Sequence, residues 1–173
     1  RVAVKKMMMA ARSVPFIYNL YRSKNRNFES VKPGIPPDTD LVLISTYFEN
    51  YYTCKKLCAY LKTKNIPVII GGPGFNNKRV TREWLNIEGV HAIVGSEIDG
   101  FMADLVKDFL NGQDIRKYPG VFTKEGKDAD TSYIFKEMNE LPVPDFTDFP
   151  WDKYPMRIIP YMTARGCGWG KCN

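Results

Sequence analysis

Short apolar runs that end in turn residues recur through the middle of the chain. They are DLVLIS at residues 40–45, IPVIIGGPG at 66–74 and HAIVGS at 91–96. Runs of this length, rich in Val and Ile and followed by Gly or Ser, are typical of strands buried on both faces of a parallel sheet. The pattern therefore predicts a buried strand in each of these segments.

Two other segments repeat their apolar positions at the helical period. In the first segment these positions are Tyr51, Cys54, Leu57, Cys58 and Leu61, and in the second they are Phe101, Leu105, Phe109 and Leu110. Asp99 is a candidate N-cap of the second helix, and Gly112 is a candidate C-cap. The alternation of strands and helices predicts an α/β fold, a doubly wound, Rossmann-like parallel sheet with right-handed crossovers. Residues 118–135 are expected to form a hairpin around Gly126.

Candidate ligand-binding residues gather where the predicted strands end, because doubly wound sheets bind ligands beyond the carboxyl ends of their strands. These residues are Ser45, Thr46 and Tyr47, then Gly71, Gly72, Pro73 and Gly74, and finally Gly95 and Ser96. Glycines let a ligand approach the backbone, and the hydroxyl groups either bind a ligand or cap the following helix. The GGPG turn has neither the GxGxxG spacing nor the P-loop lysine of nucleotide sites, so a plain strand-to-helix turn is the alternative.

The composition changes near Asn139, where proline becomes frequent. The segment NELPVPDFTDFPWDKYP contains Pro142, Pro144, Pro150 and Pro155. Proline-rich segments are stiff and extended, and they commonly connect domains. The sequence therefore predicts a first domain at residues 1–136, a linker at 137–156 and the start of a second domain at 157–173, where RIIPYMTARGC predicts a new strand.

The cysteines fall into two pairs with different surroundings. Cys54 and Cys58 belong to the apolar stripe of a predicted helix, where a thiol most often packs in the core. Cys167 and Cys172 lie in the glycine-rich loop ARGCGWGKCN, which suits a soft metal or an iron–sulfur cluster. Two thiolates do not complete a site of four ligands, so one half of a zinc ribbon is an alternative interpretation.

His91 is the only histidine of the chain. Without a second histidine, the common zinc and hydrolytic templates are missing, and no pair of nucleophile and base can be assigned. The sequence therefore predicts no catalytic residue, and the position of His91 just before a strand favours a surface or capping role.

The formal net charge is +6, and the basic residues are concentrated before Glu29, the first acidic residue. A polyanion-binding arm is one interpretation, but a solvated helix face is favoured because no nucleic-acid-binding motif accompanies the charge. No apolar run is long enough for a membrane span or a signal peptide. These features predict no membrane partner and no nucleic-acid partner. The four cysteines, in the absence of secretory features, predict a protein of the reducing cytoplasm. The missing initiator Met suggests a segment of a longer protein.

In their order along the chain, four segments resemble the N-terminal region of a cobalamin-binding-domain radical S-adenosylmethionine enzyme. They are DLVLISTYF, IPVIIGGPGFN, HAIVGSEIDGFMADLVKDFLNGQ and NELPVPDFTDFPWDKYPMRIIPYMTARGCGWGKC. The last is the most specific, because the LPxPDF linker, an aromatic–aspartate pair and RGC occur together. That family has a Rossmann-like cobalamin domain, a proline-rich linker and then a partial (β/α) barrel.

The resemblance implies that cobalamin binds at the carboxyl ends of the strands. Ser45 would contact the nucleotide tail of cobalamin, the Gly71–Gly72 turn would leave it room, and the loop with Gly95 and Ser96 would complete the pocket. Tyr47 stands where Leu is usual, Ser96 stands where many members have Glu, and the Asp-x-His-x-x-G motif of a lower axial ligand is absent. An alternative is therefore a Rossmann-like domain that no longer binds cobalamin and holds a substrate or a partner protein.

The resemblance also implies that Cys167 and Cys172 are the first two ligands of a 4Fe–4S cluster, with a third cysteine beyond Asn173. The rest of the barrel would then bind S-adenosylmethionine, and the parent enzyme would transfer a methyl group to an unactivated carbon. The 173 residues of this chain would not complete that reaction by themselves, and the substrate is not predicted.

Overall fold

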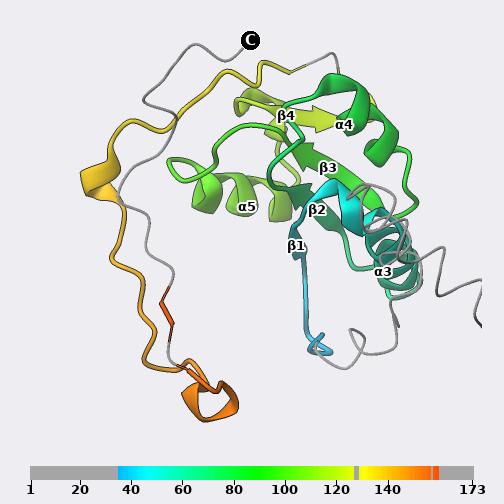
Figure 1. Ribbon diagram of the computed structural model, residues 1–173. Helices are drawn as coiled ribbons and strands as arrows, with labels where there is room; N and C mark the ends of the chain where they lie inside the picture. The colour runs from blue at the N-terminus through cyan, green and yellow to red at the C-terminus, as the bar shows by residue number, and fades with distance from the viewer. Residues whose placement is uncertain (1–34, 127–128, 157, 160–173) are drawn as a thin grey trace, which may run out of the picture. The chain divides into compact units, whose positions relative to one another are not determined.

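The structure, a computed structural model, describes residues 35–126, 129–156 and 158–159 (Figure 1). The chain divides into two units, Arg1–Met138 and Asn139–Asn173. The described part of the first unit contains a four-stranded sheet and the helices that pack on it. The predicted borders of the linker at residues 137 and 156 stay predictions.

The sheet consists of β1 (Val42–Ser45), β2 (Val68–Gly71), β3 (Val90–Val94) and β4 (Val121–Thr123), in the order β1-β2-β3-β4. The first three strands are parallel, and β4 runs antiparallel to β3. Short runs of Val and Ile form these strands because branched side chains pack well on a pleated surface that is covered on both sides. The predicted α/β class and Rossmann-like arrangement are confirmed.

Three α-helices connect the strands. Helix α3 (Tyr51–Thr63) follows β1, α4 (Lys78–Leu85) follows β2, and α5 (Met102–Leu110) follows β3. In the described ranges the 3-10 helices are η3 (Phe48–Asn50), η4 (Ile115–Lys117), η5 (Met138–Glu140) and η6 (Trp151–Lys153). None of the helices in the described residues is long and apolar enough to cross a lipid bilayer.

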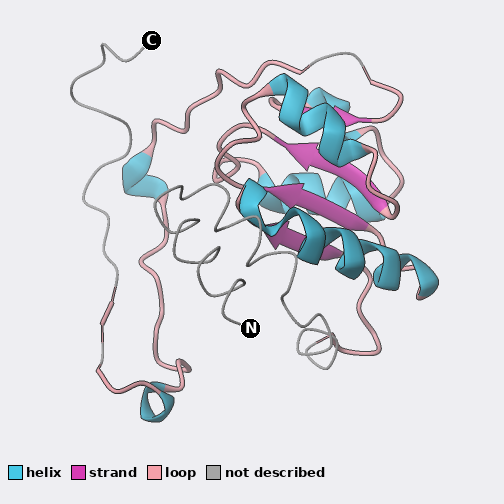
Figure 2. Cartoon of the chain, turned by 45° about the vertical axis from the view of Figure 1, so that its right-hand side comes forward, coloured by secondary structure: helices cyan, strands magenta, loops and turns pink. Residues whose placement is uncertain are grey.

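The helices cover both faces of the sheet (Figure 2). Helices α3 and α4 pack on one face, where Trp84 meets the rings of Phe75 and Tyr51 edge-on at centroid distances of 5.0 and 5.2 Å. Helix α5 packs on the other face through Phe101 and Leu105. The parallel strands β1, β2 and β3 lie side by side in chain order. Right-handed crossovers between such strands place α3 and α4 on the same face of the sheet. Helix α5 leads to the antiparallel β4, so this rule does not apply to it, and it covers the opposite face.

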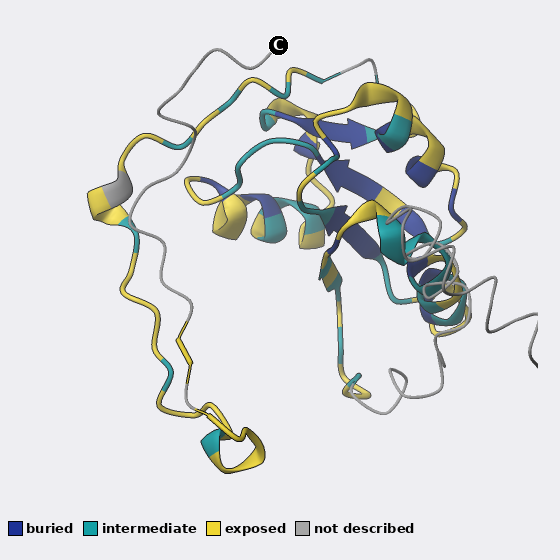
Figure 3. Cartoon of the chain, viewed as in Figure 1, coloured by how far each residue is buried: buried dark blue, intermediate teal, exposed yellow. Residues whose placement is uncertain are grey.

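Burial is greatest on the two central strands and declines toward the β1 edge (Figure 3). Ile70 and Ile93 are completely buried, on the face of α3 and α4. By contrast, Leu43 on β1 is 46% exposed, although it is a large apolar residue. The prediction of a buried strand is therefore wrong for residues 40–45, because β1 is an edge strand of the described sheet and its residues are half-buried or exposed. The described residues leave an apolar strip open beside it.

Two further details of the first unit differ from the sequence-based expectation. The prediction of a hairpin around Gly126 is wrong, because no strand follows β4 among the described residues 129–156. Strand β4 pairs with β3 instead. The predicted N-cap Asp99 is also wrong, because the N-cap position of α5 is Phe101, which makes no side-chain capping bond. Gly112 does end this helix in the left-handed region, with a φ of +69°, as expected for a residue that follows a C-cap.

In the second unit, a local aromatic cluster orders the proline-rich segment. The ring of Phe149 lies 4.6 Å from that of Trp151 and 5.0 Å from that of Tyr154. The Trp151 indole N–H donates to the Phe146 carbonyl at 3.1 Å, which closes the turn on itself. Val143 is 90% exposed, so the segment has little apolar core of its own.

Replacing Thr81 by Val is expected to destabilise the first unit by ~1–3 kcal/mol, because it leaves a buried carbonyl without a donor. Thr81 is completely buried, and its hydroxyl bonds to the Phe75 carbonyl at 2.7 Å and the Asn77 carbonyl at 3.1 Å. Thr63→Val is the matched control, because the exposed Thr63 bonds to the Tyr60 carbonyl at 2.7 Å. Urea unfolding measures both, and equal losses of stability would contradict this role of Thr81.

Candidate functional site

A small groove lies where β1, β2 and β3 reach their carboxyl ends. Its volume is about 130 Å³. Four of the residues predicted from the sequence line it: Ser45, Gly71, Gly72 and Ser96. Its apolar lining includes Leu43, Ile69, Val94, Ile98 and Met102. The groove therefore combines aliphatic walls with hydroxyl groups and exposed backbone.

The loop after β1 is held in place by the hydroxyl group of Thr46. This side chain is 6% exposed. Its oxygen accepts hydrogen bonds from the Asn50 amide at 3.3 Å and the Cys54 thiol at 3.7 Å, and it donates to the Tyr47 carbonyl at 3.3 Å. Thr46 thus holds the loop against α3 and does not line the groove.

Ser45 and Tyr47 have the more open positions on either side of Thr46. Ser45 is exposed and lines the groove, and within the described part of the chain no hydrogen bond engages its hydroxyl. Tyr47 is 57% exposed and does not line the groove. Of these two residues, Ser45 is therefore the one that can hydrogen-bond a ligand in the groove.

The glycine turn after β2 serves mainly to bring two loops together. Gly72 has a φ of +121°, and a Cβ there would overlap the Thr46 carbonyl and lie 2.9 Å from the Thr46 nitrogen. Gly74 has a φ of +103° and lies against the ring of Phe48. Pro73, between them, is exposed and outside the groove. The two glycines are needed for backbone packing, whether or not a ligand is present.

Gly71 has a different role, because it opens the groove. A Cβ at this position would meet the Val94 carbonyl oxygen at 3.6 Å and the Val94 Cβ at 4.0 Å, which are ordinary contacts. The missing side chain therefore leaves space that a larger residue would fill without straining the backbone.

The loop after β3 completes the edge of the sheet. Gly95 packs against the Phe75 carbonyl, and a Cβ would overlap it. The Ser96 hydroxyl donates to the Pro119 carbonyl at 2.7 Å, and this bond ties the β3 loop to the segment that enters β4. Ser96 therefore lines the groove with a hydroxyl that is already used within the protein.

The cysteines of α3 are part of the core. Burial raises the pKa of Cys54, and burial together with the neighbouring Cys54 raises the pKa of Cys58 to about 12. A thiol with a raised pKa is a poor nucleophile and a poor metal ligand at neutral pH. Among the residues that the structure describes, no three His, Cys, Asp or Glu side chains are grouped to hold a metal ion. The predicted cluster ligands Cys167 and Cys172 lie outside the described residues.

Sequence reasoning missed the apolar walls of the groove. Leu43 and Ser45 are two residues apart on β1, so they share a face of the strand, and Met102 begins α5. The alternation of Leu43 and Ser45 was a usable signal, whereas the contribution of α5 depends on how that helix packs. His91, at the start of β3, does not line the groove.

The chain resembles one curated protein in sequence. It is 27% identical over 145 residues to a protein of Pyrococcus horikoshii that is named as an uncharacterized methyltransferase. The match covers 79% of this chain but only 31% of that relative, so the chain spans about a third of the relative's length. No protein-family model and no solved structure matches the chain.

Replacing Gly72 by Ala is expected to destabilise the first unit more than replacing Gly112 by Ala. Both glycines have a positive φ, but nothing lies within 4 Å of a Cβ at Gly112. Backbone strain therefore costs ~1–2 kcal/mol at either position, and the overlap with Thr46 adds ~1–3 kcal/mol at Gly72 alone. The free energies of unfolding in urea give the comparison. If the two variants lost equal stability, Gly72 would not be the point of loop packing.

Proposed function

We propose that this chain is the cofactor-binding front part of a methyltransferase that uses cobalamin together with radical S-adenosylmethionine chemistry. One observation carries the proposal: Ser45, Gly71, Gly72 and Ser96 line a single groove at the carboxyl edge of a mostly parallel sheet. This is the edge at which α/β proteins bind their ligands. The name of the Pyrococcus relative supports the methyltransferase part of the proposal, and the resemblance of the motifs supports the choice of cofactors.

The residues of the groove fit one part of cobalamin. A volume of about 130 Å³ is below the range of ~300–1,000 Å³ that whole-ligand pockets usually occupy. The groove therefore suits a flat apolar portion with a polar edge, such as the base of the nucleotide tail. In the proposal, Leu43, Ile69 and Met102 exclude water from that base, and the Ser45 hydroxyl bonds its polar edge.

The neighbouring loops keep this shape. Thr46 and Gly72 fix the β1 and β2 loops against one another, and Ser96 fixes the β3 loop to the segment before β4. Because these contacts exist within the protein, the groove is formed before any ligand arrives, which lowers the entropic cost of binding.

The proposed cofactors divide the chemistry between them. When bound, cobalamin would carry a methyl group, and S-adenosylmethionine at a 4Fe–4S cluster would supply the radical that activates an unreactive carbon. Cys167 and Cys172 belong to the proposal as cluster ligands on the strength of the motif resemblance. Because the chain spans about a third of its relative, the substrate and the complete reaction belong to the whole protein.

The purified chain is expected to retain hydroxocobalamin through a desalting column, as read from its visible spectrum. Gly71→Val should lower the retained cofactor by about tenfold, because the added side chain takes up space in a small apolar pocket. The free energy of unfolding of this variant should change little, since the added atoms begin from ordinary contacts.

Ala103→Val on the exposed side of α5 is the control, because Ala103 does not line the groove. This variant should retain as much cofactor as the parent chain. A colourless parent protein after desalting would contradict cobalamin binding, and equal retention by Gly71→Val would place the cofactor elsewhere.

A further inference from the structure

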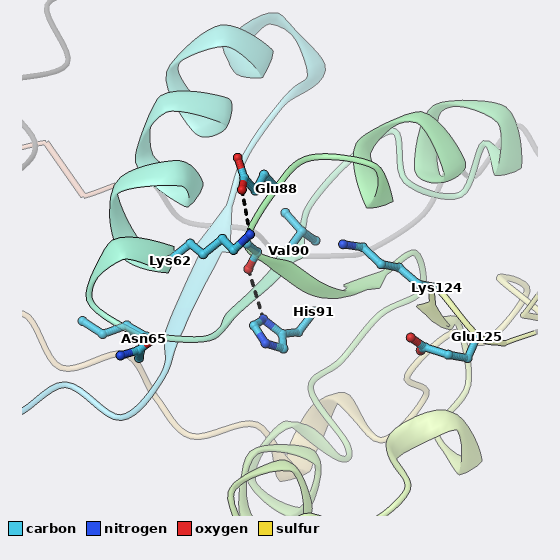
Figure 4. Close-up of a pocket in the computed structure, with 9 residues that line it drawn as sticks. Lys62, Asn65, Glu88, Val90, His91, Lys124 and Glu125 are labelled. Carbon is cyan, nitrogen blue, oxygen red and sulfur yellow. Dashed lines mark hydrogen bonds and ion pairs between the residues drawn. The ribbon is translucent and has the colours of Figure 1, made fainter.

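We propose that the opposite, amino edge of the sheet holds a second ligand site, which binds a small phosphate-bearing anion. A cavity of about 450 Å³ lies there, between the end of α3, the start of β3 and the end of β4. Lys62, Asn65, Glu88, His91 and Lys124 are among the residues that line it (Figure 4). None of them lines the groove at the carboxyl edge, so the two sites are independent.

Two lysines and two glutamates, Glu88 and Glu125, line this cavity, so an anion has to take the place of a carboxylate at a lysine. Lys62 reaches in from the last turn of α3, and Lys124 reaches in from the residue after β4; Figure 4 shows their side chains pointing toward one another. The Lys62 ammonium contacts the Glu88 carboxylate at 2.6 Å. Within the described residues, the Lys124 ammonium makes no hydrogen bond and no ion pair. One cation is thus paired by a neighbour on the chain, and the other has no such partner in the part of the chain that the structure describes.

Glu88 marks the place where an anion is stabilised. The hydrogen bond from Lys62 and the charges of Lys62 and Lys124 lower the pKa of the Glu88 carboxyl. The Glu88 carboxylate therefore interacts electrostatically with both lysines. Glu88 and Lys62 have side chains that are 66% and 57% exposed. Exposed ion pairs of this kind are weak, and an incoming anion with a higher charge can displace the carboxylate.

His91 adds a hydrogen-bond donor. The β2–β3 register skips His91, and its Nδ1 accepts the Val68 N–H at 3.3 Å in place of a backbone oxygen. When Nδ1 accepts, the proton of the neutral ring resides on Nε2, which is then free to donate. The alternative tautomer donates from Nδ1 to the Gly89 carbonyl at 3.0 Å. An anion that accepts from Nε2 would select the first tautomer.

A phosphate that displaces Glu88 gains more from each lysine than a singly charged carboxylate does, because it carries the higher charge. Glu125 also lines the cavity, and its negative charge repels an anion. Glu125 also interacts electrostatically with Arg116. Affinity for inorganic phosphate alone is therefore expected in the millimolar range, as for other small ions at exposed sites.

The only histidine of the chain gives a direct readout, since its ring produces a single set of nitrogen and proton resonances. Inorganic phosphate is titrated into the protein at fixed pH and fixed ionic strength. The His91 ring nitrogens should shift in a saturable way toward the form protonated at Nε2. Acetate at the same ionic strength should give a smaller shift.

Three variants that each remove one charge sharpen the test. Lys124→Gln should weaken phosphate binding by about fivefold, and Glu88→Gln should tighten it by about threefold, in line with single exposed charge pairs. Lys55→Gln, about two helical turns before Lys62 and outside the cavity, should leave binding within about twofold because screening limits its reach.

No saturable shift, an equal response to acetate, or no loss of affinity in Lys124→Gln would each overturn the phosphate site. Weaker binding in Glu88→Gln would also overturn it, because the carboxylate would then be a ligand-binding group rather than a competitor.

Discussion

The close packing of the Gly72 backbone against the loop at Thr46 is the constraint on which the carboxyl edge of the sheet depends. No side chain fits between the two loops, because a Cβ at Gly72 would overlap the Thr46 carbonyl. The hydroxyl of the same threonine accepts hydrogen bonds from Asn50 and Cys54. The position of the glycine turn is therefore fixed relative to α3. Thr81 then bonds the Phe75 carbonyl from α4. The loops after β1 and β2 are therefore held by backbone contacts and buried hydroxyls, and the groove beside them keeps its shape without a ligand.

The two edges of the sheet have different chemistry for a reason that lies in the topology. At the carboxyl edge, parallel strands end together and short glycine-containing loops meet, which leaves an aliphatic groove with hydroxyl groups. At the amino edge, the end of α3 and the end of the antiparallel β4 bring Lys62 and Lys124 to one cavity. Antiparallel pairing of β4 thus matters for the second site, because a parallel fourth strand would have placed Lys124 at the other edge.

The α/β class and the positions of the three parallel strands were predictable, because short runs of Val and Ile between turn residues are typical of strands. The burial of β1 was not, because the sequence does not say which strand lies at the edge of the sheet. Helix α4 was not predicted, because it has only eight residues and half of them are charged. Its local signals were the Asn77 cap and the i, i+4 spacing of Val80 and Trp84. The pairing of β4 with β3 depends on tertiary contacts that no local pattern contains. For the site, the sequence placed Ser45, Gly71 and Gly72 at one edge, where the structure also has them. It did not show that Gly72 also packs against Thr46, or that Gly74 packs against Phe48 outside the groove, because these contacts are between loops.

Hydrogen exchange of the backbone amides, with and without hydroxocobalamin, is the most direct measurement of where the proposed cofactor binds. The account predicts slower exchange in the loops that follow β1, β2 and β3, at residues 45–47, 71–75 and 95–97, and unchanged exchange at residues 88–91 on the opposite edge. Protection confined to residues 88–91, or no protection in any of the three loops, would contradict the assignment of the groove to this cofactor.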